Sequence, residues 1–542
     1  MILRYQKNMR STFCVLLFSA LTIGAQHTHT PSASEKPVAL YPGLGTYSHR
    51  INTSNPEAQK YFDQGLALLY GFNRYEALRS FRKAAELDPK AVMPLWGIAA
   101  ALAPHINMDM DGDVDLKEGC AALTRANPLS LNATEYERGY LESAASRCPE
   151  YKPEAYSNAM RQVYQRYPDD LDAATLYAES LMIPVRWQWF QADGQPAGQM
   201  DEAIRILEQV MRRDRNHPGA NHFYIHAVEM SPSPERAIPS AIRLMGVVPA
   251  AGHLVHMPGH IWLALGEWET AAAVNEQAAR ADRNYFATTG VQGGYAGYYL
   301  HNLHFIVYAR AMQGRAANAI AAADFLAAES RPALETMAEM ADCFIPYNIL
   351  ARVRFHRWNE ILAAPKPAEK LLSTTALWHW ARAQAYKAQG NVASAQQEAK
   401  LFNEAKAKIP AEWPWLNNKA RAVLDLAGQV LEARLVPSNA DAISHWRRAV
   451  EMQDQLVYDE PPPWYMPLRE SLGAALLRSG NATEAEQVFR EGLRRLPRNG
   501  RMLFGLHAAL DAQNKKDAAE LVKREFDREW KGADTMLRMA DF

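Results

Sequence analysis

The sequence has few cysteines, no excess of charge of one sign and, beyond its first 25 residues, no long apolar run. Its four cysteines are too few for a disulfide scaffold. Its 59 basic and 60 acidic side chains nearly cancel, so no general electrostatic attraction draws it to nucleic acid or anionic membranes. No later segment stays apolar for the roughly 18 residues that a membrane helix needs. We therefore expect no nucleic-acid partner and no stable membrane insertion.

Several catalytic motifs are missing as well. The chain has no glycine-rich phosphate loop, no nucleophile elbow and no basic aromatic patch, and neither H-E-x-x-H nor C-x-x-C occurs. These absences leave no positive signal for an NTPase, a serine hydrolase or a nucleic-acid binder. The composition, 48% apolar and 22% charged, is that of a globular protein. Because one core rarely exceeds about 250–300 residues, 542 residues predict several domains or an elongated repeat.

The first 50 residues indicate export. Three basic residues precede the apolar run 13–25, which is typical of a signal peptide over residues 1–25, with a buried N-terminal helix as the alternative. Residues 26–50 are polar and contain proline, so they predict a flexible lead-in. The mature protein is then expected in the periplasm or outside the cell. In that oxidising compartment Cys120 and Cys148 can pair, although the sequence alone does not establish the bond, and Cys343 is expected to be a small buried residue.

Apolar residues recur every three or four positions nearly everywhere, which predicts an all-α fold. Small and aromatic residues occupy positions 8, 20, 24, 27 and 32 of a 34-residue unit that starts at 58: Gly65, Ala77, Phe81, Ala84 and Pro89. A unit that starts at 466 follows the same frame with Leu472, Gly473, Gly480, Ala485, Phe489 and Pro497. These offsets resemble the tetratricopeptide repeat, a pair of antiparallel helices that stacks into an α-solenoid.

The resemblance covers most of residues 51–530. Prolines near residue 365 and in 410–415 predict a joint, so we expect one array over 51–362, a second over 363–530 and a tail over 531–542. The whole chain also resembles bacterial secreted tetratricopeptide proteins that carry the segments HFYIHAVE and GHLVHMPGH. That group has no assigned activity, so this resemblance implies a fold and a compartment but no reaction.

Seven histidines in the middle of the chain follow the repeat period. They are His222, His226, His253, His256, His260, His301 and His304. The step from His222 to His256 is 34 residues, as is the step from His226 to His260. The last two histidines follow after steps of 48, which predicts a 14-residue insertion around residues 286–296. Residues three or four apart share a helix face, so three successive repeats place their histidines in rows.

The tetratricopeptide resemblance implies that these rows face the concave groove, where ligands of that family bind. Neutral imidazole is a strong ligand for zinc, copper and iron, so the histidines predict a transition-metal site. Glu229, three residues after His226, is a candidate metal ligand, orienting group or general base.

Alternatives remain at this point. The histidines can instead form a polar substrate site, line an ordinary peptide groove or have a structural role. Two functional hypotheses follow: a metal-binding protein that acts on a small or peptide substrate, or a non-catalytic interaction scaffold. The groove ligand is a peptide or a small molecule in either case, and the sequence leaves open whether the protein is an enzyme.

Overall fold

The computed structural model describes residues 35–107, 114–191, 193–291 and 294–542. The predicted signal peptide and the first part of the lead-in lie outside these residues. In the described part, no helix is both long and apolar enough to cross a membrane.

Antiparallel helix pairs follow one another along the chain, so the predicted all-α solenoid of tetratricopeptide type is confirmed. The first half contains α1 (Pro56–Tyr70), α2 (Arg74–Leu87), α3 (Met93–Ala101), α4 (Leu116–Ala126), α5 (Glu135–Ala145), α6 (Pro153–Arg166), α7 (Leu171–Met182), α8 (Met200–Arg213), α9 (Pro218–Glu229), α10 (Ile238–Val247), α11 (Gly252–His256), α12 (Pro258–Ala264) and α13 (Trp268–Thr289). Short 3-10 turns are η1 (Asn127–Asn132), η2 (Ile183–Val185), η3 (Pro234–Ala237), η4 (Arg331–Leu334) and η5 (Met539–Asp541).

The second half is helical apart from one short hairpin. It contains α14 (Ala296–Met312), α15 (Ala316–Ser330), α16 (Ala338–Phe344), α17 (Tyr347–Arg354), α18 (Trp358–Ala363), α19 (Leu372–Ala388), α20 (Val392–Ala407), β1 (Pro414–Trp415), β2 (Asn418–Lys419), α21 (Ala420–Leu435), α22 (Asn439–Asp454), α23 (Leu468–Arg478), α24 (Ala482–Arg495), α25 (Gly500–Ala512) and α26 (Lys516–Glu529). The hairpin β1–β2 lies in the proline-containing segment that breaks the helical pattern.

The repeat frame has a direct packing cause. Gly65 and Gly97 both lie against the Phe81 ring, and a Cβ on either glycine would clash with it. Near the other end of the chain, Gly473 and Gly505 lie against Phe489 in the same way. One aromatic ring thus fills the space between two small residues on neighbouring first helices, which holds consecutive pairs at a fixed separation.

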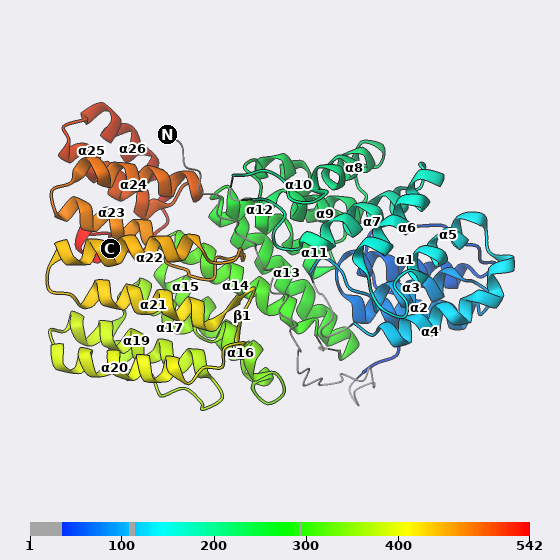
Figure 1. The fold of residues 1–542 in the computed structure, drawn as a ribbon, viewed down its shortest axis with the longest axis horizontal. Coiled ribbons are helices and arrows are strands. Elements are labelled where there is room, and N and C mark those ends of the chain that lie inside the picture. Colours follow the sequence, from blue (N-terminus) through cyan, green and yellow to red (C-terminus); the bar gives the residue numbers. More distant parts are fainter. Residues whose placement is uncertain (1–34, 108–113, 192, 292–293) are drawn as a thin grey trace, which may run out of the picture.

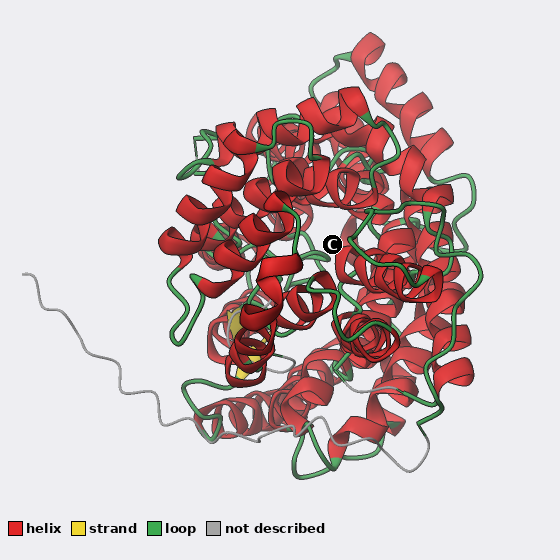
Figure 2. Ribbon diagram, turned by 90° about the vertical axis from the view of Figure 1, so that its right-hand side faces the viewer, coloured by secondary structure: helices red, strands yellow, loops and turns green. Residues whose placement is uncertain are grey.

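The two ends of the molecule are joined by the histidine segments. Helices α1–α7 lie at one end and α19–α26 at the other, with α9, α12, α13 and α14 between them (Figure 1). The buried apolar residues form two main clusters, one running to Ile261 and the other starting at Leu263, and Trp262 packs against both. Viewed along the long axis, the helices surround the end of the chain (Figure 2).

Several local expectations can be compared with the fold. The extra residues of the 48-residue step mostly lengthen α13, which has 22 residues where α8 has 14. Residues 35–50 of the lead-in lie along the solenoid and bond to it, for example through Gln64 to the Ala39 carbonyl. Cys120 and Cys148 form a disulfide, and Cys343 is buried.

Candidate metal centre

Four helices supply the histidines. His222 and His226 lie on α9, one turn apart on its buried face. His253 and His256 lie on α11, and His260 lies on α12, directly after the break at Pro258. A proline has no N–H to donate and interrupts the helix there. The fourth helix, α14, contributes His301.

The structure sorts six of these histidines into two neighbouring groups of three. The first triad is His222, His226 and His253, and the second triad is His256, His260 and His301; within each, one ligand atom per residue lies within 4.8 Å of the others. The two triads are adjacent, because the His253 and His256 ring centroids lie 5.5 Å apart and those of His226 and His260 also 5.5 Å.

The imidazoles within a triad approach closely through their Nε2 atoms. The Nε2 atoms of His222 and His253 are 3.2 Å apart, and those of His256 and His260 are 2.8 Å apart. The Nε2 atom of His226 is buried without a hydrogen-bond partner in the described part of the chain. These Nε2 atoms therefore face one another, and the two close pairs lie within hydrogen-bond distance.

The opposite nitrogens, Nδ1, are held by oxygen atoms. His222 Nδ1 donates to the Tyr70 carbonyl oxygen at 2.5 Å, and His256 Nδ1 donates to Asn275 Oδ1 at 2.6 Å. His226 Nδ1 donates to Glu229 Oε1 at 3.0 Å. Since such acceptors require the proton on Nδ1, the neutral rings of His222, His226 and His256 keep their Nε2 lone pairs for the centres of the triads.

Glu229 links the two triads, and a second carboxylate joins it. Its other oxygen, Oε2, lies 2.6 Å from His260 Nδ1. His260 Nδ1 also donates to Glu460 Oε2 at 2.7 Å. Glu229 therefore contacts one histidine of each triad, at the nitrogen that points away from the triad centre. This placement favours an orienting role over direct ligation.

Burial and crowding keep most of the imidazoles neutral. Burial, followed by repulsion from neighbouring imidazoles, lowers the pKa of His222, His253 and His301 well below its ordinary value. His260 differs. Burial opposes its charge, but Glu229 and Glu460 outweigh that effect and raise the pKa of His260 to about 10.

Apolar rings enclose the centre. Phe72 lies against the first triad, with its centroid 4.5 Å from His222 and 5.0 Å from His253. Phe305 lies 4.7 Å from His256 and 5.0 Å from His301 in the second triad. Such walls exclude water, which strengthens polar interactions within the site.

Most histidines expected in the concave groove are not exposed to solvent. Five of the six triad histidines are 0–4% exposed, and only His301 is partly exposed. The cover includes a capping segment, residues 456–467, which carries Glu460 over the second triad. The hairpin anchors this segment, because Trp415 Nε1 donates to the Pro463 carbonyl at 3.0 Å and Asn418 Nδ2 donates to Asp459 Oδ2 at 2.7 Å.

A cleft of about 630 Å³ adjoins the centre from outside. Glu229, Tyr458 and Glu460 line its inner end, and apolar side chains such as Leu263 and Trp464 line its walls. The cleft thus reaches the two carboxylates, which in turn contact the imidazoles.

His304 does not join either triad. Although it lies one helical turn after His301, its ring stacks on Tyr465 at 5.1 Å and lies 4.2 Å from Tyr347. Neither ring nitrogen of His304 has a hydrogen-bond partner in the described residues, and burial lowers its pKa to about 3. The structure therefore places His304 in an aromatic stack behind the second triad.

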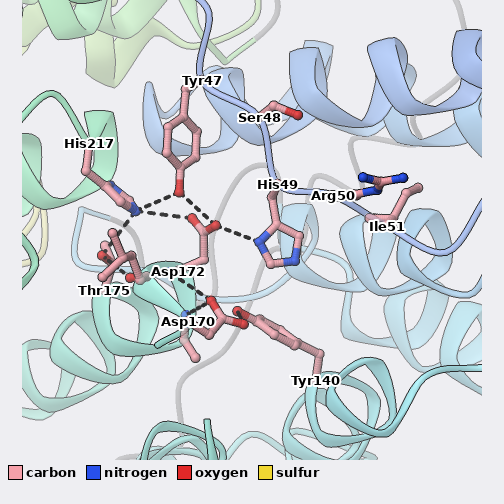
Figure 3. A network of polar contacts seen from close by, with 12 residues as sticks. Tyr47, Ser48, His49, Arg50, Ile51, Tyr140, Asp170, Asp172, Thr175 and His217 are labelled. Atoms are coloured by element: carbon pink, nitrogen blue, oxygen red, sulfur yellow. Dashed lines mark hydrogen bonds and ion pairs between the residues drawn. The ribbon is translucent and has the colours of Figure 1, made fainter. Parts of the chain in front are cut away.

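A polar network around Asp172 on α7 connects Tyr47, His49 and His217 (Figure 3). Asp172 accepts hydrogen bonds from Tyr47 at 2.8 Å, Tyr70 at 2.5 Å and His49 Nδ1 at 2.7 Å. His217 Nε2 lies 3.3 Å from the same carboxylate, and its Nδ1 accepts from the backbone at the start of α9. The network fixes both the Tyr70 segment that binds His222 and the first turn of α9.

Three partners of the triads have no signal in the sequence. Asn275 and Tyr70, whose backbone carbonyl is the acceptor, lie on repeat helices and belong to no motif. Glu460 lies 200 residues after His260, beside a proline run that predicts only a rigid turn. The spacing of the histidines carries no information about any of them.

No family model and no curated protein matches the sequence. Solved structures with a similar course of the chain include a human IFIT1 dimer with m7Gppp-AAAA (11% identity, 88% of this chain and 91% of that one, TM-score 0.32). Another is yeast Tom70, with 12% identity over 87% of this chain and 90% of that one and a TM-score of 0.31. A third is the P58(IPK) TPR domain, with 12% identity over 85% of this chain and 99% of that one and a TM-score of 0.20. Similarities this distant say nothing about the function of this chain.

Proposed function

We propose that this protein binds two transition-metal ions, one in each histidine triad. The observation that carries the proposal is the paired arrangement: two adjacent groups of buried imidazoles whose Nε2 atoms converge. Metal-ligating histidines characteristically donate their other ring N–H to an oxygen acceptor, and His222, His226, His256 and His260 all do so.

The donor set indicates which metals to expect. A purely imidazole environment suits zinc, copper and iron, and it disfavours the oxygen-loving magnesium and calcium. A metal with bonds of about 2.0–2.1 Å to nitrogen holds tetrahedral ligands about 3.3 Å apart. The 3.2 Å separation of His222 and His253 fits that value, and the 2.8 Å of His256 and His260 fits a narrower angle at the metal.

Three protein ligands per ion leave a coordination position free, which is typical of metals that bind a substrate or a small molecule. The adjoining cleft supports access for such a ligand, because it reaches Glu229 and Glu460. In this proposal Glu229 is a positioning residue for both ions, since it holds His226 and His260 by their outer nitrogens. A peptide or small molecule would enter from the apolar side of the cleft.

We also propose that the protein is exported. The signal peptide predicted over residues 1–25 supports a location in the periplasm or outside the cell. The Cys120–Cys148 disulfide supports an oxidising compartment, because such bonds seldom persist in a reducing cytosol.

A second candidate function is that of a protein-interaction scaffold. The stacked helix pairs favour it, since such solenoids offer extended surfaces to other chains. Under that hypothesis the histidines would be structural, and partner binding would be independent of metal.

Metal analysis of the protein purified without an affinity tag separates the two hypotheses. We expect two ions per chain in the wild type and about one in both His222→Ala and His256→Ala. His445→Ala is the matched control, because His445 lies on α22, remote in sequence from the triads, and contacts Gln429. Circular dichroism checks that each variant keeps its helix content.

The scaffold hypothesis predicts another outcome. A metal content below about 0.1 ion per chain, with no rise in Tm on adding zinc, copper or iron, would contradict the metal proposal, because an ion that binds the folded state must stabilise it. Equal metal content in His256→Ala and the wild type would also contradict it.

A further inference from the structure

The spacing of the imidazole rings is the same between the two triads as within them. Between the triads, the ring centroids of His253 and His256 are 5.5 Å apart, and so are those of His226 and His260. Within the first triad, the centroids of His226 and His253 are 6.2 Å apart. Rings that belong to different triads are therefore no farther apart than rings that would share one ion.

The second triad has similar dimensions. The ring centroid of His301 lies 4.9 Å from that of His256 and 6.0 Å from that of His260. The six imidazoles thus form one continuous cluster in which the two proposed ions are direct neighbours. Metal ions that act together in protein sites lie about 3.5–4 Å apart, close enough for one small ligand to contact both.

The charges around this cluster favour an anion between the ions. Neutral imidazoles bring no charge, and the carboxylates that contact triad histidines in the described residues are Glu229 and Glu460, both at outer Nδ1 atoms. Two divalent ions carry four positive charges, so two remain uncompensated even when both carboxylates are ionised. Because a charge buried away from water is costly unless it is paired, the site would take up an anion.

The surroundings limit this anion to a small one. Phe72 lies against the first triad and Phe305 against the second. Of the six triad histidines, only His301 is partly exposed. A ligand of two or three atoms can approach the cluster beside His301, whereas the larger cleft reaches only the carboxylates behind it.

We propose that the two triads form a coupled centre, in which one small anion such as hydroxide bridges the two metal ions. This inference rests on the proposed binding of two ions, and it adds that the ions act as a pair and that their common ligand is a small anion.

Electron paramagnetic resonance (EPR) of the protein loaded with Cu(II) tests the coupling. Elemental analysis counts the copper ions, and EPR counts their unpaired electrons. An isolated Cu(II) ion contributes one unpaired electron, whereas a bridging ligand couples two such spins and removes their signal. We expect two coppers per wild-type chain, with most of the EPR signal missing. Unfolding in acid should restore the signal, because it separates the ions without reducing them.

His222→Ala and His256→Ala are matched variants, since each keeps one triad intact. Each should bind about one copper and show the full signal of that ion. A variant with less copper than the wild type should therefore give more EPR signal. His445→Ala keeps both triads and should behave like the wild type. Azide, a small anion that absorbs light when bound to Cu(II), should bind to the wild type in a ratio of one per copper pair.

Several results would overturn the coupled centre. One is a wild type with two coppers per chain and the full EPR signal of both, which would leave the two-ion proposal standing. Others are two azides bound per chain, or a missing signal that acid does not restore. A chain that binds no copper, zinc or iron would contradict the proposed function itself, so the two failures are distinguishable.

Discussion

Glu229 and Glu460 differ in how many triads they contact, and this difference predicts distinct effects on the two proposed metal ions. Glu229 contacts His226 in the first triad and His260 in the second. Of the triad histidines in the described residues, Glu460 contacts His260 alone. We therefore expect Glu229→Gln to weaken metal binding at both triads, and Glu460→Gln to weaken it only at the second.

The magnitude follows from the acceptors that remain. Loss of an outer partner of a metal-ligating histidine weakens metal binding by about 10–100-fold, which corresponds to about 1.4–2.7 kcal/mol. His260 keeps Glu229 in the Glu460→Gln variant, so the effect there should lie near tenfold. Glu229→Gln removes the charged acceptor that His226 uses, so its effect on the first triad should lie nearer 100-fold.

Competitive titration against a coloured chelator measures the two dissociation constants. His222→Ala and His256→Ala, each with one intact triad, assign the constants to the triads. Glu412→Gln is the control, because Glu412 is 79% exposed and pairs only with Lys419. The reasoning is refuted if Glu460→Gln weakens both ions equally, or if Glu229→Gln leaves the first triad within about twofold of the wild type, the usual scatter between uncoupled sites.

Three further predictions concern stability. Gly97→Ala should destabilise the fold by about 1–3 kcal/mol, because the added methyl group clashes with the packed Phe81 ring. Gly246→Ala, which has open space around it, should be neutral or stabilising by up to about 1 kcal/mol. Chemical denaturation compares the two variants, and equal unfolding midpoints would contradict the packing argument. Replacing Cys120 and Cys148 together by serine should cost about 3–4 kcal/mol for a loop of 28 residues, measured as a fall in unfolding free energy that reducing agent reproduces in the wild type. The folded-state pKa of His49 is raised to about 9. The contribution of its charge to stability is therefore complete below about pH 6.5 and is lost as the pH rises through 9. The difference in unfolding free energy between the wild type and His49→Gln should shrink over that range, and a constant difference would contradict this prediction.

Much of the architecture was predictable because it repeats. The 34-residue spacing of small residues around Phe81 and Phe489 predicts the packing that the structure contains. The same period brings His222, His226, His256 and His260 onto neighbouring helices, since stacked repeats superimpose equal positions. Local periodicity is enough for such conclusions.

The division of the histidines was not predictable from that spacing. His301 and His304 are three residues apart and so differ by about 60° around the axis of α14. That angle is enough for His301 to face α12 while His304 stacks on Tyr347 and Tyr465. Which direction each ring takes depends on neighbours from other parts of the chain.

The sequence by itself therefore determined the helical repeat, the faces on which the histidines lie and the small residues that bring the helices close, because all of these are periodic and local. Only the tertiary structure decided that the histidines are buried, that they form two triads and that Glu460 holds His260. The capping segment folds back across 200 residues to do this. Such a contact depends on how the whole solenoid curves, and no spacing along the chain records that.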